Sequence, residues 1–364
     1  MKKISLSFVL FSLVSFVSFS QKSNVYLDSL TESFRKEHKI PSLAVAYVTT
    51  DSIYYGISGT TKIDGTQKVN LKNKFHIGSN TKAITSFIAM KFIEEDKISL
   101  ETKFFDLFKE MKSEKNTFYH EITLGDLLSH NAGIQSYTAG VEFKKLPDFK
   151  GTTSEKRKSF SEFVLNENSV PKGTYSNAGY VLASLMLEKI GGKSYEELLK
   201  KTFSDLNLDY FIGFPNKESI DNPWGHWIEF ITNIPLAPDH FYKMEDFMVS
   251  AGDISMNIID YSKFIQLHLK GLFGEDNYLK SENYKALHLG KPNMAYGWGN
   301  AKSNSLTFSY HDGSAGTFYT HLLISHEMKT AVIVFANSAD TETQKGIYKL
   351  REQVMENNHN FAND

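Results

Sequence analysis

The sequence predicts a mixed α/β (α+β) fold, in which strands from both ends of the chain form one sheet and a helical region is inserted between them. Runs rich in β-branched and aromatic residues occur near residues 42–57 and again at 296–336, whereas residues 79–210 follow mostly helical spacing. This order is typical of a sheet assembled from distant segments. The 364 residues are enough to bury a substantial core in one large domain or two ordinary ones.

The individual elements follow from the spacing of apolar residues. At the start of the chain, Val25, Leu27, Leu30 and Phe34 lie near helical spacing and predict a first helix over residues 24–38. A polar turn then separates two predicted strands at residues 42–48 and 52–57. Towards the C-terminus we expect four short strands and a closing helix, at residues 296–301, 306–310, 319–325, 330–336 and 341–356, respectively.

The first twenty residues are typical of a secretory signal peptide. Lys2 and Lys3 form a basic start, residues 4–19 are apolar apart from serines, and Ser18 and Ser20 place small residues before a cut ahead of Gln21. The alternative, a membrane anchor, needs about 20 strongly apolar residues, and this stretch is shorter. We therefore expect cleavage, a mature protein that is periplasmic or secreted, and no membrane span after cleavage.

Composition excludes several kinds of chemistry. The chain has 42 Asp and Glu against 40 Lys and Arg, and this balance argues against a nucleic-acid partner. It has no cysteine, which excludes thiolate catalysis, disulfides, zinc–cysteine sites and iron–sulfur clusters. No histidine or carboxylate pattern indicates a metal site, and no motif implies an organic cofactor. Oxygen and nitrogen chemistry remain.

The first candidate motif is Ser79-Asn80-Thr81-Lys82. Residues three apart share a helix face, so the Ser79 hydroxyl and the Lys82 amine can meet. A serine becomes a good nucleophile when an adjacent base takes its proton, and a lysine can be that base when burial lowers its pKa. The stripe Ile84, Phe87 and Ile88 supports a buried helix just after it. Taken alone, Ser79 fits an ordinary helix N-cap better than a nucleophile.

The second motif is Tyr175-Ser176-Asn177, on a loop that leads into an apolar helix at residues 180–190. Tyr175 can relay a proton, especially as a phenolate beside Lys82, and Asn177 can hydrogen-bond a substrate carbonyl or Lys82. The third motif is His311-Asp312-Gly313-Ser314, at the end of the strand predicted at 306–310. Gly313 allows close approach of a substrate, and the N–H of Ser314 can donate to an oxyanion. Each motif alone is also compatible with a packed turn or a structural histidine.

Together, in this order, the three motifs resemble the serine β-lactamase and penicillin-binding-protein superfamily, and most of all its class C-like branch, which includes esterases and D-amino-acid peptidases. Three connecting stretches are similar to the family as well: the run into the nucleophile at residues 75–79, the helix at 122–134 and the glycine turn at 250–254. The resemblance covers about residues 30–336. It implies a catalytic domain at 24–358, in which an antiparallel sheet flanked by helices (about 24–98 and 250–358) adjoins a mainly helical part (about 99–249).

The resemblance also implies a mechanism. Ser79 attacks a carbonyl as Lys82 removes its proton, and Tyr175 shuttles that proton. The backbone N–H groups of Ser79 and Ser314 bind the oxyanion, while Asn177 and His311 position a small-molecule or short peptide substrate. No metal or cofactor is needed. Oligomeric state is not indicated.

One departure from the family pattern bears on the substrate. Members that bind a free carboxylate carry Lys-Thr-Gly or Lys-Ser-Gly, whereas here a titratable His311 and then Asp312 precede Gly313. If Asp312 faced the site as an anion, it would repel a substrate carboxylate. We therefore expect esters, amides or small peptides rather than β-lactams or D,D-peptides. A second functional class, a non-catalytic periplasmic sensor that binds without turnover, stays open at this point.

Overall fold

The computed structural model describes residues 23–112, 116–138, 140–229, 232–242 and 244–363. The signal peptide expected at residues 1–20 lies outside these residues. Within them, no helix is both long enough and apolar enough to cross a membrane.

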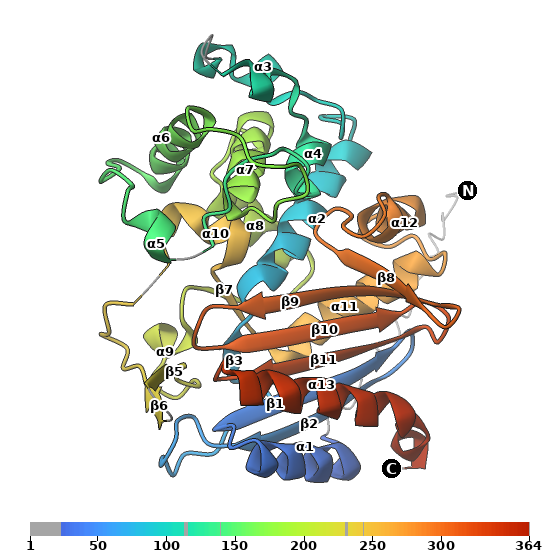
Figure 1. Cartoon of the computed structure of the whole chain (residues 1–364). Helices are drawn as coiled ribbons and strands as arrows, with labels where there is room; N and C mark the ends of the chain where they lie inside the picture. Colours follow the sequence, from blue (N-terminus) through green and yellow to red (C-terminus); the bar gives the residue numbers. More distant parts are fainter. Residues whose placement is uncertain (1–22, 113–115, 139, 230–231, 243, 364) are drawn as a thin grey trace, which may run out of the picture.

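A six-stranded antiparallel sheet is the centre of the fold (Figure 1). Its strand order is β2-β1-β11-β10-β9-β8, so the first two strands of the chain pair with the last four. The strands are β1 (Ser42–Thr49), β2 (Ile53–Gly59), β8 (Gly299–Ser303), β9 (Leu306–Ser314), β10 (Tyr319–Ser325) and β11 (Thr330–Ala336). The predicted mixed fold, with one sheet built from both chain ends, is confirmed.

Helices cover both faces of this sheet. Helices α1 (Val25–Glu37) and α13 (Thr341–Glu356) pack on one face, where alternate β1 residues such as Leu43 and Val45 point. The residues between them, such as Ala44 and Ala46, point to the other face and to α11 (Ile258–Leu272). Strand β1 is thus buried on both sides, which explains its nearly continuous apolar sequence.

The segment between β2 and β8 is largely helical, and Figure 1 shows most of its helices gathered beyond one edge of the sheet. Its helices are α2 (Thr81–Glu94), α3 (Phe104–Leu107), α4 (Leu124–Leu128), α5 (Gly140–Phe143), α6 (Thr153–Leu165), α7 (Asn177–Gly191), α8 (Tyr195–Asp205), α9 (Pro215–Glu218), α10 (Val249–Gly252), α11 (Ile258–Leu272) and α12 (Ser281–Leu289). Short 3-10 helices are η1 (Gly78–Asn80), η2 (Lys109–Met111), η3 (Thr117–Glu121), η4 (Asp246–Met248) and, after α13, η5 (Asn358–Asn363).

Two small sheets connect these parts. Strand β3 (Lys74–His76) pairs with β7 (Ile254–Asn257), which also pairs with β4 (Phe211–Ile212). Strands β5 (His226–Glu229) and β6 (Thr232–Pro235) form a hairpin. The β3–β7 pair brings the segment before Ser79 against the segment that follows α10, although the two lie far apart in the sequence.

Two predicted strands differ from the structure at their ends. The strand expected at 296–301 begins at Gly299, because Gly297 has a positive φ of 83° and turns the chain before the strand. The strand expected at 306–310 continues to Ser314, because residues 311–314 pair with β10.

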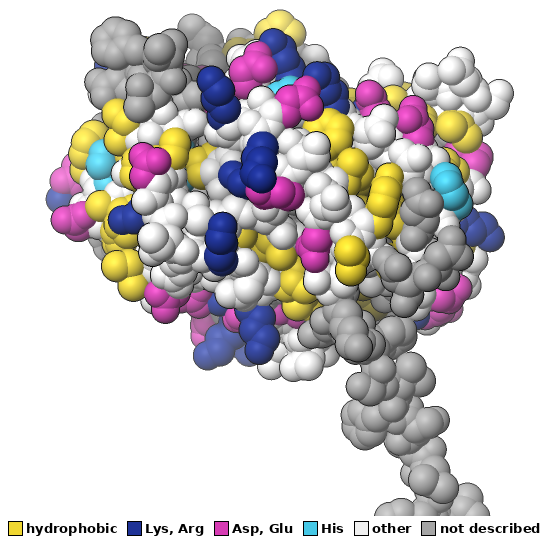
Figure 2. All heavy atoms as spheres, turned by 90° about the horizontal axis from the view of Figure 1, so that it is seen from below, with side chains coloured by type: hydrophobic (Ala, Val, Ile, Leu, Met, Phe, Trp, Pro, Cys, Tyr) yellow, Lys and Arg dark blue, Asp and Glu magenta, His cyan; other side chains and the backbone are white. Residues whose placement is uncertain are grey.

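Figure 2 shows that basic and acidic side chains are interspersed on the face of the molecule that it displays.

Candidate active site

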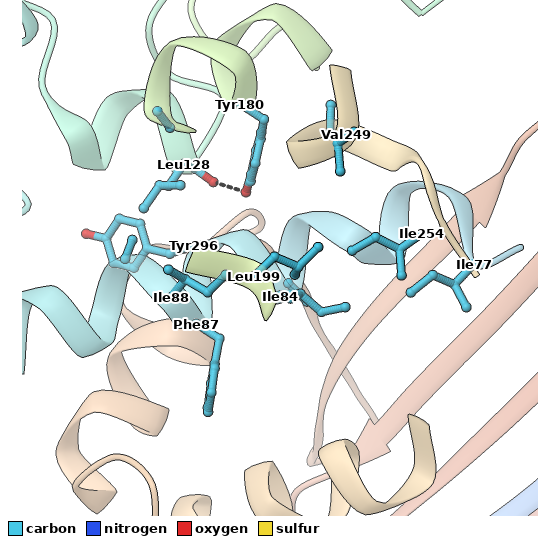
Figure 3. Packing of buried hydrophobic residues seen from close by; sticks show 14 of the residues in the cluster. Ile77, Ile84, Phe87, Ile88, Leu128, Tyr180, Leu199, Val249, Ile254 and Tyr296 are labelled. Atoms are coloured by element: carbon cyan, nitrogen blue, oxygen red, sulfur yellow. Dashed lines mark hydrogen bonds between the residues drawn. The ribbon is translucent and has the colours of Figure 1, made fainter. Parts of the chain in front are cut away.

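Ser79 lies in a turn that is fixed on both sides. The turn η1 joins β3 to α2, and Gly78 adopts a positive φ of 52° that favours glycine. The Thr81 hydroxyl donates to the Gly78 carbonyl at 2.7 Å. Behind the turn, Ile84, Phe87 and Ile88 of α2 are buried, as Figure 3 shows, so the predicted stripe is confirmed. The Ser79 residue itself is only partly buried.

Lys82 is fully buried in the first turn of α2. Its Nζ lies 3.2 Å from Oγ of Ser79, 2.6 Å from Oδ1 of Asn177 and 2.6 Å from the carbonyl oxygen of Ala251. None of these partners is a carboxylate. Burial lowers the pKa of Lys82 well below its usual value, since the charged form loses its hydration. A neutral amine has two N–H bonds for the two close acceptors and a lone pair left for the Ser79 hydroxyl.

The second motif also lies at this place. Ser176 caps α7 by accepting a hydrogen bond from the Gly179 N–H, which fixes Asn177 as the first residue of that helix. The Asn177 amide nitrogen donates to the Tyr137 carbonyl at 2.8 Å, and this bond turns the amide oxygen towards Lys82. The Tyr175 hydroxyl is hydrogen-bonded to Ser79, and its ring centre lies 4.8 Å from Nζ of Lys82.

The protonation state of Tyr175 differs from the phenolate considered above. Burial raises the pKa of the Tyr175 phenol above its usual value, and the hydrogen bond to Ser79 offsets only part of this effect. The phenol is therefore protonated at neutral pH. Tyr175 can act first as a proton donor rather than as a base.

The third motif approaches Ser79 closely through two glycines. A Cβ atom added to Gly313 would lie 2.0 Å from the Ile77 carbonyl oxygen, and one added to Gly78 would lie 2.6 Å from the Ser314 backbone nitrogen. Real Cβ atoms do not come so close to other atoms. Glycine at both positions thus lets β9 contact the Ser79 turn backbone to backbone. Ser314, at the end of β9, is exposed.

His311 is buried and faces the Lys82 side of β9. Its Nδ1 donates to the Asp312 carbonyl oxygen at 2.9 Å, which leaves Nε2 without a proton in the neutral ring. Burial, assisted by the positive charge that Lys82 can carry, lowers the pKa of His311 to about 4. His311 is thus uncharged at neutral pH.

The possibility that Asp312 faces the site is wrong. Successive residues of a strand point to opposite faces, so Asp312 points away from His311 and Gly313. Its carboxylate is 2.6 Å from Nδ1 of His321 on β10 and accepts from the Tyr348 hydroxyl of α13 at 3.2 Å. Although burial alone would raise it, the hydrogen bond from His321 lowers the pKa of Asp312. The anion therefore lies on the far face of the sheet.

Sequence reasoning did not single out His130 and Tyr242. The Nδ1 atom of His130 accepts from the Ser176 N–H at 3.0 Å, and its ring centre lies 4.2 Å from that of Tyr175. Burial, followed by the nearby Lys82, lowers the pKa of His130. The Tyr242 hydroxyl donates to the Ala315 carbonyl at 2.9 Å and holds the chain just beyond Ser314. In the sequence, His130 could have been found only from its place in the 122–134 segment, which resembles the family. Nothing in the sequence pointed to Tyr242 as a residue near the site.

The structure therefore brings all seven predicted residues to one place at the junction of η1, α2, α7 and β9. They are Ser79, Lys82, Tyr175, Asn177, His311, Gly313 and Ser314. Among the described residues, no group of three or more histidine, aspartate or glutamate side chains could hold a metal ion.

Comparison with known proteins identifies the family. A sequence model of the Beta-lactamase family matches residues 27–355, which is most of the chain. The chain belongs to the beta-lactamase family. The resemblance drawn from the three motifs is thereby confirmed.

Three proteins of known sequence or structure share 17–21% of aligned residues with this chain. Protein flp of Staphylococcus aureus is 21% identical over 342 residues, which cover 92% of this chain and 66% of that protein. The chain thus spans slightly less than two thirds of the length of this relative. An octameric penicillin-binding protein homologue from Pyrococcus abyssi is 20% identical, with a TM-score of 0.73 over 91% of this chain and 77% of that one. A class C beta-lactamase from Rhodobacter sphaeroides is 17% identical, with a TM-score of 0.70 over 90% and 98%. These similarities establish the beta-lactamase fold.

Proposed function

We propose that the protein is a serine hydrolase that works through an acyl-enzyme intermediate. The observation that carries this proposal is the environment of Lys82. Its amine is fully buried, has two close neutral acceptors, and lies 3.2 Å from the hydroxyl of a partly exposed serine. A buried cation without an anionic partner is costly, so the geometry favours the neutral amine that a general base needs.

Acylation follows from this arrangement. The Ser79 hydroxyl transfers its proton to the lone pair of Lys82 as Oγ bonds to the carbonyl carbon. The backbone N–H groups of Ser79 and Ser314 donate to the resulting oxyanion, because β9 lies against the Ser79 turn. When the bond to the leaving group breaks, the Tyr175 hydroxyl gives its proton to the leaving atom and recovers one from Lys82.

Deacylation uses the same groups in reverse order. A water molecule loses a proton to the Tyr175–Lys82 pair and attacks the acyl carbon. The ester bond to Ser79 then breaks, Oγ takes the proton back, and the acid product leaves. Asn177 and His311 position the substrate, and Asn177 also holds the Lys82 amine in place.

The substrate class proposed is an ester, an amide or a small peptide without a carboxylate beside the reacting carbonyl. Asp312 does not supply the reason, because it lies on the other face of the sheet. The reason is His311, since its low pKa leaves no permanent positive charge at the position where carboxylate-binding members carry lysine. Activity on β-lactams or D,D-peptides is the alternative.

We further propose that the chain is exported, on the basis of residues 1–20. Their basic start, apolar stretch and small residues before Gln21 support a cleaved signal peptide. Intact mass of the protein recovered from the periplasm or the medium would test this, with a first residue at or near Gln21 as the expected result.

Hydrolysis by the wild-type protein and by Ser79→Ala tests the activity. The substrates are p-nitrophenyl esters, D-amino-acid amides and nitrocefin, and intact mass after a fluorophosphonate tests for the acylated serine. Turnover and labelling by the wild type only would support the proposal. An equally active Ser79→Ala protein would refute the nucleophile. A long-lived adduct without turnover would identify a sensor, and fast nitrocefin hydrolysis would overturn the proposed substrate class.

A further inference from the structure

A buried histidine–aspartate pair lies directly behind the nucleophile turn. His76, the last residue of β3, is fully buried, and its Nδ1 accepts a hydrogen bond from the Gly78 N–H at 3.1 Å. Its Nε2 lies 3.0 Å from Oδ1 of Asp253, which is also buried. The ring is held by stacking on Phe214, at 4.8 Å between ring centres.

The partners of His76 determine where its proton lies. Because Nδ1 accepts from a backbone N–H, it carries no proton itself, so the proton is on Nε2 and points to Asp253. The hydrogen bonds therefore run in one direction, from Gly78 to His76 and from His76 to Asp253. An aspartate that fixes the ring and tautomer of a histidine in this way is a known positioning arrangement.

Both ends of this chain of hydrogen bonds reach the reacting groups. Gly78 immediately precedes Ser79 and lies against the Ser314 backbone. Asp253 follows α10, whose Ala251 carbonyl accepts from Lys82 at 2.6 Å. One short segment therefore holds Lys82 through a carbonyl and Gly78 through His76. A loss of the His76 contact would let the Ser79 turn move relative to Lys82 and Ser314.

We infer that His76 and Asp253 are positioning residues for the nucleophile turn. This inference rests on the proposed function, because it takes Ser79 as the nucleophile. The pair does not touch the substrate. It holds the Gly78 N–H, and with it the direction of the Ser79 backbone N–H and the distance from Oγ to Nζ of Lys82. Small errors in such distances reduce rates strongly.

Two substitutions of His76 separate positioning from packing. The His76→Asn side chain keeps an oxygen acceptor near the place of Nδ1 for the Gly78 N–H, but it loses the contact to Asp253. The His76→Gln side chain does the reverse, because it keeps a donor towards Asp253 and leaves the Gly78 N–H without an acceptor. Both remove the ring that stacks on Phe214, so both lose the same stacking contact. We expect kcat and the rate of fluorophosphonate labelling to fall at least tenfold more in His76→Gln than in His76→Asn, with KM changed less than threefold.

Each result decides the question. Equal losses in the two variants, in step with equal losses of thermal stability, would show a packing role and overturn the inference, as would a fully active His76→Gln protein. If either variant fails to fold, Asp253→Ala and Asp253→Asn replace the pair. The alanine frees the His76 ring and should lose activity, whereas the asparagine retains an oxygen acceptor and should restore most of it. Equal activities of these two would overturn the inference. An active Ser79→Ala protein would instead refute the proposed function.

Discussion

Gly313→Ala is the sharpest test of how β9 meets the Ser79 turn. The added Cβ atom would lie 2.0 Å from the Ile77 carbonyl oxygen and 2.7 Å from Nδ2 of Asn80. Cβ atoms almost never come within 3.0 Å of another atom, so strand and turn must separate by about 1 Å. The first contact is with backbone, which cannot rotate away as a side chain can. The two N–H groups proposed for the oxyanion would then no longer converge.

The size of the effect follows from what that separation removes. Loss of one oxyanion donor, or a misplacement of about 1 Å, costs about 10² to 10³ in rate. We therefore expect kcat/KM for a p-nitrophenyl ester to fall by about that factor. Overpacking at a buried site costs about 1–3 kcal/mol, so the protein should remain folded while its unfolding midpoint in urea decreases.

Gly140→Ala is the matched control, because a Cβ atom at Gly140 of α5 would meet no atom within 4 Å. It should keep the wild-type rate and stability. A Gly313→Ala protein that keeps its rate within threefold would refute the close approach of β9 as the source of the oxyanion site. A rate that falls only because the protein has unfolded would be recognised from its circular dichroism.

Three further predictions concern charge. Lys82→Arg should lower kcat by about 10² to 10⁴ at every pH from 6 to 10, because a guanidinium stays protonated and cannot accept the serine proton; a pH at which its rate recovers would contradict this. Asn177→Asp places an anion beside the Lys82 amine, and an attraction of about 4 kcal/mol at about 4 Å raises the pKa of Lys82 by about three units, so the midpoint of the pH–rate profile should rise. The neutral control Asn177→Ser should lower the rate without moving that midpoint. Equal midpoints in the two variants would exclude a neutral Lys82 as the base. Burial lowers the pKa of His268 to about 3 and that of His226 and His311 to about 4, all below the usual 6.5. The unfolded chain therefore binds more protons, and the free energy of unfolding, measured in urea, should be highest above pH 6.5 and fall as the pH decreases towards 4; a pH-independent value would be inconsistent with neutral buried histidines.

The sequence was sufficient where the signal is local. The strands and helices at both ends appear as clear periodicities, and the Ser79–Lys82 spacing places both side chains on one helical turn. The strand end near Ser314 was missed because Asp312, Gly313 and Ser314 are typical turn formers. In the protein, pairing with β10 overrides that local preference, and the strand alternation then turns Asp312 away from the site.

Contacts between distant segments could not be predicted from one sequence. His76 and Asp253 lie 177 positions apart, and no spacing rule connects them. The same is true of Ala251 and Lys82, which lie 169 positions apart and meet beside the β3–β7 pair. The burial that lowers the pKa of Lys82 is likewise a property of the folded chain, since it depends on what packs around α2.

Four ionisable groups around Ser79 are held uncharged, and this has a consequence for the proposed reaction. Burial favours the neutral forms of Lys82, His130 and His311 and a protonated Tyr175. In the proposed reaction, Ser79 gives its proton to Lys82, so a cation forms at the moment at which the oxyanion forms beside it. The attraction between them exists in the transition state and not in the resting site, which is the condition for catalysis rather than tighter binding. A substrate carboxylate near Lys82 would stabilise the ammonium before the reaction, so that a proton would already occupy the lone pair of Lys82. Only a second cation near the carboxylate would offset this effect. Neutral acyl donors keep the base available, and this is the physical reason to screen them first.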